Sequence, residues 1–463
     1  MSSIQQTISP VDDSVYVERP LAGESDIAAA LDAAEAAQSK WKHSSITERA
    51  AICRRFTEAM LAKRDALGLE ITWQMGRPIR YTPREIDRMA DRSFFMTDVA
   101  EEMLSDIKLG QLEGFTRFIR HEPLGVLFAI VPWNYPYLTA VNSVVPAIMA
   151  GNSVLLKHSP QTPLCAERIF EAFKEAGLPE GVFQYLHLSN EDADRIVRSP
   201  QIDAVAFTGS VAVGRTVQKA ASDRFIGVGL ELGGKDPAYV RADANLPRAI
   251  ENVVDGALFN SGQSCCAVER VYVHADVYDA FVDGAAALTR EYVLGNPLEE
   301  SATLGPLVRK SSADFVRQQI ADAVKQGART LIDESGFALS CADTAYLAPQ
   351  ILTGVDHSMS LMRDESFGPV VGIMKVQSDE EAIKLMNDSQ FGLTASVWTA
   401  DTEAALRIGD AIETGTVFMN RCDYLDPELA WTGVKDSGRG CTLSKLGYEH
   451  MTRPKSYHLR TTI

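Results

Sequence analysis

Apolar residues recur at helical spacing through the first hundred residues of the chain. The two clearest helical faces consist of Ile27, Leu31, Ala34, Gln38 and Trp41, and of Ile52, Phe56, Met60, Lys63 and Leu67. Thr47 is the candidate cap of the second helix, and Gly76 and Pro78 end that helix because both residues disfavour a helix interior. The first hundred residues are therefore predicted to be helical.

From residue 125 the pattern changes to short apolar runs separated by segments long enough for a helix. The runs that we predict to be strands are 125–131, 153–157, 182–187, 204–208 and 226–232. A helix between the second and third runs has Thr162 as its cap, Pro163 at its first position and Gly177 at its end. Strands that alternate with helices predict a parallel, doubly wound sheet, which binds ligands at the carboxyl ends of its strands.

A second alternating series follows Gly233 and Gly234. It contains a predicted helix over 246–260 and predicted strands over 268–274 and 416–420. The fold class is therefore α/β, with two domains of the doubly wound, Rossmann-like type.

The composition excludes several classes of function. With 463 residues the chain holds about two or three domains. Its 62 acidic side chains outnumber 45 Lys and Arg, and the net charge of −17 disfavours nucleic acids and acidic membranes as partners. The apolar runs are shorter than the roughly 20 residues of a membrane helix, and the N-terminus lacks the pattern of a signal peptide, so we expect a cytoplasmic protein. The seven cysteines include no C-x-x-C pair, so neither a disulfide framework nor a metal site is expected.

A nucleotide-binding loop is the first candidate for chemistry. The G-x-G-x-x-G fingerprint is absent, but Gly209 and Gly214 follow a predicted strand and open a helix, where backbone N–H groups can hold a pyrophosphate. Arg215 stands where a Walker A loop has Lys, which argues against a nucleoside triphosphatase. On spacing alone, an ordinary turn between strand and helix is an equally good interpretation.

Three further groups stand at the ends of predicted elements. Cys265, with Cys266 beside it, follows a helix that ends in glycine; Glu231 ends a strand; and Asn134 lies between two prolines after another strand. Each has an ordinary explanation, as a buried thiol, a salt-bridged carboxylate or a turn-capping amide. Together, a thiol nucleophile, a carboxylate base and an amide donor are the groups needed for acyl chemistry through a thioester.

The motifs around these groups resemble those of the NAD(P)-dependent aldehyde dehydrogenase superfamily over essentially the whole chain. The matching segments are Pro132-Trp133-Asn134-Tyr135-Pro136, Leu230-Glu231-Leu232-Gly233-Gly234-Lys235, Asn260-Ser261-Gly262-Gln263-Ser264-Cys265 and Glu365-Ser366-Phe367-Gly368-Pro369. The resemblance implies that Cys265 attacks an aldehyde, that the Asn134 amide and the Cys265 N–H hold the oxyanion, and that Glu231 activates the water that hydrolyses the thioester.

The resemblance also implies a bound NAD. The residues implied to contact it are Trp133, Lys157, Gly209, Ser210, Leu232, Gly233, Glu365 and Phe367. Many NAD-preferring relatives carry Glu where this chain has Pro160, and that carboxylate repels the 2′-phosphate of NADP. NADP is therefore not excluded.

The resemblance also bears on the substrate. The residues implied to contact it are Tyr135, Asp423 and Trp431, and an aromatic face with nearby acids is similar to enzymes that oxidise amino-aldehydes. Arg421 argues against a cationic substrate, and succinate semialdehyde is the alternative. A CoA-acylating relative is a further alternative, which Glu231 disfavours because such enzymes commonly lack this base.

The resemblance implies an assembly of identical subunits. We expect a cofactor domain over 1–106 and 122–233, a catalytic domain over 234–432, and an oligomerisation arm of β-structure over 107–121 and 445–463. The alternating pattern of 107–121 is typical of an exposed hairpin that needs covering. A homodimer or homotetramer is expected.

Overall fold

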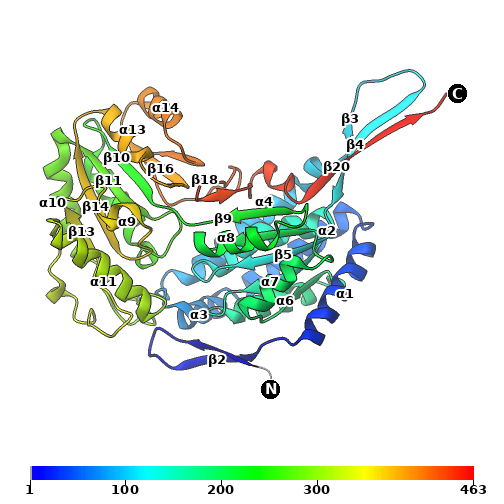
Figure 1. Ribbon diagram of the computed structural model, residues 1–463, viewed down its shortest axis with the longest axis horizontal. Helices are drawn as coiled ribbons and strands as arrows, with labels where there is room; N and C mark the ends of the chain where they lie inside the picture. Colours follow the sequence, from blue (N-terminus) through cyan, green and yellow to red (C-terminus); the bar gives the residue numbers. More distant parts are fainter. Residues whose placement is uncertain (1–2, 463) are drawn as a thin grey trace.

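The computed structural model describes residues 3–462 and contains two α/β lobes side by side, with a β-arm that projects from one of them (Figure 1). The first lobe is built on a sheet of strand order β19-β9-β8-β5-β6-β7. Its strands are β5 (Val126–Val131), β6 (Ser153–His158), β7 (Phe183–Tyr185), β8 (Ala204–Thr208), β9 (Gly227–Glu231) and β19 (Gly438–Arg439). All pairs are parallel except β19 with β9, which confirms the five predicted strands and the doubly wound class.

Helices cover both faces of this sheet because successive strand residues point to opposite sides. The helices of this lobe are α1 (Glu24–Trp41), α2 (Ile46–Ala62), α3 (Arg64–Met75), α4 (Thr82–Leu104), α5 (Pro136–Ala150), α6 (Pro163–Glu175), α7 (Asn190–Arg198) and α8 (Val211–Ala220). Helices α2 to α6 share one core with alternate residues such as Leu127 and Ala129, whereas α1, α7 and α8 share the other with Val126 and Phe128. Strand order reverses between β5 and β8, so the loops after these two strands flank the expected ligand crevice.

The second lobe is built on a sheet of order β12-β13-β14-β11-β10-β16-β17. Its strands are β10 (Asp236–Val240), β11 (Val268–His274), β12 (Arg329–Thr330), β13 (Gln350–Thr353), β14 (Val370–Val376), β16 (Thr394–Trp398) and β17 (Thr416–Met419). Its helices are α9 (Leu246–Leu258), α10 (Tyr278–Thr289), α11 (Lys310–Lys325), α12 (Ser360–Arg363), α13 (Asp379–Asn387) and α14 (Thr402–Ala411). Helices α9 and α10 pack on one face and α13 and α14 on the other, which confirms the second doubly wound unit.

The β-arm is a three-stranded antiparallel sheet of order β20-β4-β3, and it extends away from the body of the molecule (Figure 1). It consists of β3 (Ile107–Lys108), β4 (Phe115–Pro123) and β20 (Thr452–Arg460). The tail pairs with β4 of the same chain along nine residues, and the rings of Phe118 and Tyr457 stack with centroids 4.5 Å apart. The predicted hairpin region is thus a sheet whose outer edges are β3 and β20.

Several local predictions are wrong. The chain begins with a hairpin, β1 (Ile4–Ile8) and β2 (Val15–Pro20), where only helices were expected. The single helix expected behind Thr47 is two helices, α2 and α3, because the backbone breaks at Lys63. Ser45 is the cap of α2, since its hydroxyl accepts the Glu48 N–H at 3.1 Å.

Thr162 precedes α6 as expected, but its hydroxyl does not cap the helix. The hydroxyl lies 3.0 Å from Nδ1 of His158, and Oε1 of Gln74 accepts the Leu164 N–H at the helix start instead. A distant side chain has taken the role that local sequence assigns to the threonine. None of the helices within residues 3–462 combines the length and apolar character needed to cross a membrane.

Candidate active site

The nucleophile candidate Cys265 lies in a tightly bent loop between α9 and β11. Asn260 has a φ of 54° and Gly262 a φ of 72°, both in the left-handed region. The Asn260 amide Nδ2 donates to the Gln263 carbonyl at 3.1 Å, and the Gln263 side chain accepts the Val308 N–H at 2.8 Å. The side chains of the N-x-G-Q segment therefore hold the backbone that presents Cys265.

Two glycines allow other loops to approach this backbone closely. A Cβ on Gly262 would lie 2.1 Å from the carbonyl oxygen of Gly368, and one on Gly234 would lie 2.4 Å from the carbonyl oxygen of Cys265. Neither position has room for a side chain, since real Cβ contacts do not fall below about 3 Å. The loops that carry Gly234, Gly262 with Cys265, and Gly368 thus pack directly on one another.

Asn134 follows β5 and is buried beside the nucleophile loop. Its Nδ2 donates to the backbone carbonyl of Gln263 at 3.2 Å. The backbone carbonyl of Asn134 accepts from Nδ2 of Asn260 at 3.4 Å and from Nη2 of Arg77. The structure therefore brings the predicted amide donor and the Cys265 loop together.

A buried ion pair that sequence reasoning missed supports this arrangement. Arg77 and Glu85 form a 2.6 Å contact with side chains 2% and 1% exposed. Arg77 also donates to Oδ1 of Asn260 at 3.0 Å, and the second oxygen of Glu85 accepts the first N–H of α5, that of Tyr137, at 2.9 Å. Arg77 lies between Gly76 and Pro78, whose effect on helix formation is the only local signal at this position.

Glu231 ends β9, and its carboxylate lies between two threonines. Thr208 donates to one oxygen at 3.2 Å and Thr442 to the other. Burial raises the pKa of Glu231, while the two hydroxyls and Arg92 oppose that shift. A raised pKa suits a general base that works near neutral pH. Glu231 lines a cavity of about 290 Å³ together with both threonines and Cys441.

The two adjacent thiols differ in environment. Cys266 is 3% exposed and lies 3.0 Å from Oδ1 of Asp423, which also accepts from the hydroxyl of Ser264 at 3.1 Å. The hydrogen bond with Cys265 and burial raise the pKa of Cys266 well above that of a free thiol. Cys265 is the half-exposed member of the pair, so it is the one that a substrate can reach.

The residues implied to hold the nicotinamide end of a cofactor also converge. The rings of Trp133 and Phe367 meet edge to face with centroids 5.6 Å apart. Glu365 accepts the Gly234 N–H at 3.1 Å, and a Cβ on Gly233 would lie 2.4 Å from the Glu365 carboxylate. Burial raises the pKa of Glu365 to about 8, with the charge of Glu269 adding to the shift.

Glu269 and Lys235 are positioning residues that sequence reasoning missed. They form a fully buried ion pair, and Glu269 accepts the backbone N–H groups of Ser366 at 2.8 Å and Phe367 at 2.9 Å. Lys235 belongs to the matching segment that contains Glu231, whereas Glu269 lies on β11, outside the four matching segments. The ion pair holds the loop that presents Glu365.

Lys157 offers a charged group for a ligand. Its side chain is 5% exposed, and within residues 3–462 it makes no ion pair or side-chain hydrogen bond. Burial lowers its pKa to about 8. A buried ammonium with free donors fits the hydroxyl groups of a nucleotide ribose, and a Glu365 carboxylate fits as an acceptor for a second ribose. The donor set therefore suits a dinucleotide.

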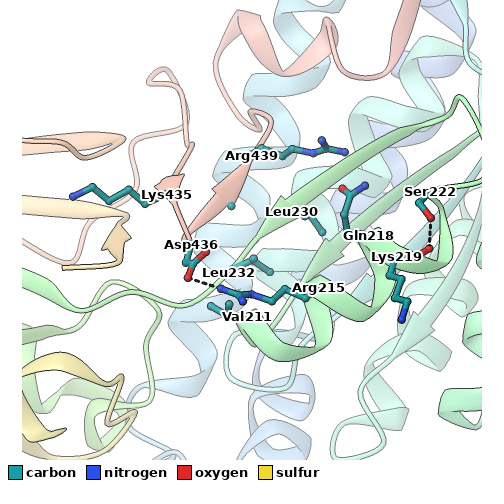
Figure 2. Close-up of a pocket in the computed structure, with 11 residues that line it drawn as sticks. Val211, Arg215, Gln218, Lys219, Ser222, Leu230, Leu232, Lys435, Asp436 and Arg439 are labelled. Atoms are coloured by element: carbon teal, nitrogen blue, oxygen red, sulfur yellow. Dashed lines mark hydrogen bonds and ion pairs between the residues drawn. The ribbon is translucent and has the colours of Figure 1, made fainter.

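Gly209 and Ser210 stand at the N-terminus of α8, as predicted, where backbone N–H groups favour an anion. A groove of about 450 Å³ lies along another side of this helix, and of the predicted cofactor residues only Leu232 lines it. Figure 2 shows Arg215 extended toward Asp436 in this groove, where the two side chains meet at 2.6 Å. The pair joins α8 to the turn before β19.

The residues predicted to contact substrate lie near the thiols. The guanidinium of Arg77 lies 4.4 Å from the ring centre of Tyr135. Trp431 is buried in a small apolar cluster that also contains Cys266, and Cys265 packs against this cluster. Asp423 holds the nucleophile loop through the contacts given above, and its pKa is raised by burial to about 7.

The chain is similar to known proteins over almost its whole length. The model of the aldehyde dehydrogenase family matches residues 2–457. An aldehyde dehydrogenase of Paenarthrobacter nicotinovorans is 36% identical over 91% of this chain and 92% of its own. A succinate semialdehyde dehydrogenase [NAD(P)+] of Escherichia coli is 34% identical over 95% of each chain. The crystal structure of an NAD-dependent aldehyde dehydrogenase from Sinorhizobium meliloti is similar with a TM-score of 0.95, at 32% identity over 99% of this chain and 92% of that one.

Proposed function

Because the chain belongs to the aldehyde dehydrogenase family, an NAD(P)-dependent class of oxidoreductases, we propose that Cys265, Asn134 and Glu231 carry out its oxidation of an aldehyde to a carboxylic acid. The observation that carries this assignment is the packing of the Asn134 amide against the loop of the half-exposed Cys265. These groups come from three segments far apart in the chain.

The reaction begins at the sulfur. The Cys265 thiolate attacks the aldehyde carbon, and the resulting oxyanion accepts hydrogen bonds from the Asn134 amide and the Cys265 N–H. A bound nicotinamide would supply the acceptor for the hydride. Loss of that hydride leaves an acyl thioester on Cys265.

Hydrolysis of the thioester requires a base. Glu231 takes a proton from a water molecule, whose oxygen attacks the acyl carbon and releases the acid and the Cys265 thiolate. Burial raises the pKa of Glu231, which strengthens it as a base, and the hydroxyls of Thr208 and Thr442 hold its two oxygens in place. The presence of this base supports transfer to water over transfer to CoA.

The decisive experiment is replacement of the sulfur. Cys265→Ser is expected to abolish formation of reduced cofactor, while Cys266→Ser, a matched change at the neighbouring buried thiol, retains the acylation step. Mass spectrometry of wild-type enzyme during turnover is expected to find an acyl adduct on Cys265. Unimpaired oxidation by Cys265→Ser would overturn the assignment.

The cofactor proposed is NAD, with NADP also accepted. Lys157, Glu365, Trp133 and Phe367 provide the polar and aromatic contacts for it. Pro160 offers no carboxylate to repel a 2′-phosphate, and its carbonyl accepts the Thr7 hydroxyl at 2.8 Å. The ratio of kcat/KM with the two cofactors measures this preference.

An aldehyde with a carboxylate is the substrate that we propose in place of an amino-aldehyde. The carboxyl group of Asp423, predicted to attract a cation, is engaged by Ser264 and Cys266. Two cations lie over the ring of Tyr424 on the same loop, with the guanidinium of Arg421 at 3.2 Å and that of Arg88 at 5.8 Å from the ring centre. Succinate semialdehyde, on which the Escherichia coli relative acts by name, is therefore the first substrate to test.

A homodimer or homotetramer is proposed for the assembly. The projecting arm presents edges at β3 and β20 and exposed apolar side chains such as Ile107 and Leu459. Unpaired strand edges of this kind are ordinarily covered in soluble proteins. Light scattering that shows a stable, fully active monomer would contradict the proposal.

A further inference from the structure

Arg92 on α4 is a buried cation with unused donors. Its side chain is 8% exposed, and Nη1 donates to Oδ1 of Asn142 at 3.0 Å and to the carbonyl of Leu138 at 3.2 Å. Among residues 3–462 no partner is found for its Nε and Nη2, and neither atom is sealed from solvent. No carboxylate within residues 3–462 forms an ion pair with Arg92, unlike the fully buried Arg77, which pairs with Glu85.

Its surroundings place Arg92 beside the reacting groups. One turn earlier on α4, the guanidinium of Arg88 lies 5.8 Å from the ring centre of Tyr424, whose neighbour Asp423 contacts Cys266. Helix α4 therefore lies against the loop that carries Asp423 and Tyr424, and this loop in turn contacts the nucleophile loop. The Asn142 acceptor of Arg92 is followed on α5 by Ser143, which lines the same cavity as Glu231. Burial lowers the pKa of Arg92, and the carboxylates of Glu231 and Glu85 oppose that shift.

A buried guanidinium without a counterion is energetically costly. Burial of a charge is tolerated when it is paired or fully hydrogen-bonded, and Arg92 has only two neutral acceptors. The Asn142 side chain binds Nη1 and so fixes the plane of the guanidinium, while the edge formed by Nε and Nη2 stays free. A planar edge with two N–H donors matches a carboxylate in a bidentate arrangement.

Building on the proposed function, we propose that Arg92 binds the distal carboxylate of the substrate and so selects carboxylated aldehydes over neutral ones of equal length. Asn142 acts as a positioning residue for Arg92. The substrate carboxylate accepts hydrogen bonds from Nε and Nη2 of Arg92, while the aldehyde carbon lies at Cys265. Arg77 does not compete for this role because Glu85 neutralises it.

The test compares two substrates on one preparation. Wild-type enzyme is expected to have a higher kcat/KM for succinate semialdehyde than for butanal, which carries a methyl group in place of the carboxylate. Arg92→Gln is expected to lower the ratio of the two kcat/KM values about 100-fold, as found when one partner of a buried charge pair is removed. Since both substrates meet the same enzyme, any loss of folded protein cancels in the ratio.

Arg49→Gln is the matched control. Arg49 is also a buried arginine, 5% exposed, but it donates to the Met149 carbonyl at 3.0 Å at the far end of α5. Its loss is expected to lower stability and leave the ratio unchanged. Arg92→Lys keeps the charge without the planar fork and is expected to restore part of the ratio.

The outcomes separate this inference from the function on which it rests. A wild-type enzyme that oxidises butanal as well as succinate semialdehyde, or an Arg92→Gln variant with an unchanged ratio, overturns the role of Arg92 and leaves the catalytic assignment standing. A fall in the ratio in Arg49→Gln equal to that in Arg92→Gln also overturns it. Full activity of Cys265→Ser on both aldehydes overturns the proposed function itself.

Discussion

Glu85→Gln tests whether the buried ion pair organises the catalytic loop. The replacement keeps the size of the side chain and an oxygen that can still accept the Tyr137 N–H, but it removes the charge opposite Arg77. Arg77 would then remain buried, bound only to the neutral oxygens of Asn134 and Asn260.

The magnitude follows from the burial of both partners. Breaking a buried pair by removal of one charge costs about 3–5 kcal/mol, whereas an exposed pair is worth about 0–1 kcal/mol. The side chains of Arg77 and Glu85 are 2% and 1% exposed, so the range for a buried pair applies. Because the retained amide oxygen of Gln still accepts hydrogen bonds, we expect the loss in unfolding free energy at the lower end, about 3 kcal/mol.

The assay is urea unfolding followed by fluorescence, combined with steady-state kinetics. Glu70→Gln is the matched control, since its pair with Arg168 is partly exposed, at 21% and 27%, and lies away from the thiols. It is expected to cost no more than about 1 kcal/mol. Glu85→Gln is also expected to lower kcat, because misplacement of a catalytic group by about 1 Å can cost 10²-fold. A cost below 1 kcal/mol with unchanged kcat would refute the reasoning.

Two further predictions concern the reacting groups. Asn134→Ala is expected to lower kcat by about 10²- to 10³-fold with the enzyme still folded, since it removes one oxyanion donor; full activity on the preferred aldehyde would show that Asn134 is not that donor. Thr442→Val removes a hydrogen bond that lowers the pKa of Glu231, so this pKa rises further. Because the base works when ionised, activity grows as pH rises through that pKa, and the acidic limb of the kcat profile is expected to move to higher pH. An unmoved limb, or one at lower pH, would contradict Glu231 as the base.

Local patterns in the sequence were sufficient to predict most elements of the fold and to select candidate catalytic residues. Strand β11 has the predicted bounds, and the five runs of the first sheet appear as β5 to β9. Alternation of period two, helical spacing, and glycine or proline at element ends act over a few residues, so they can be read without tertiary structure. The end of a strand is also where a parallel sheet presents its side chains to a ligand, which is why Asn134 and Glu231 could be singled out.

Tertiary structure decided how these groups are held and what else surrounds them. Arg77 reaches Asn134 across 57 residues of sequence and Asn260 across 183, and Gln74 replaces Thr162 as the cap of α6 from 90 residues before Leu164. The unpaired guanidinium of Arg92 has no local signature at all. The burial of a charge, and therefore its energy and its need for a partner, depends on which distant segments pack around it, and that arrangement exists only in the folded chain.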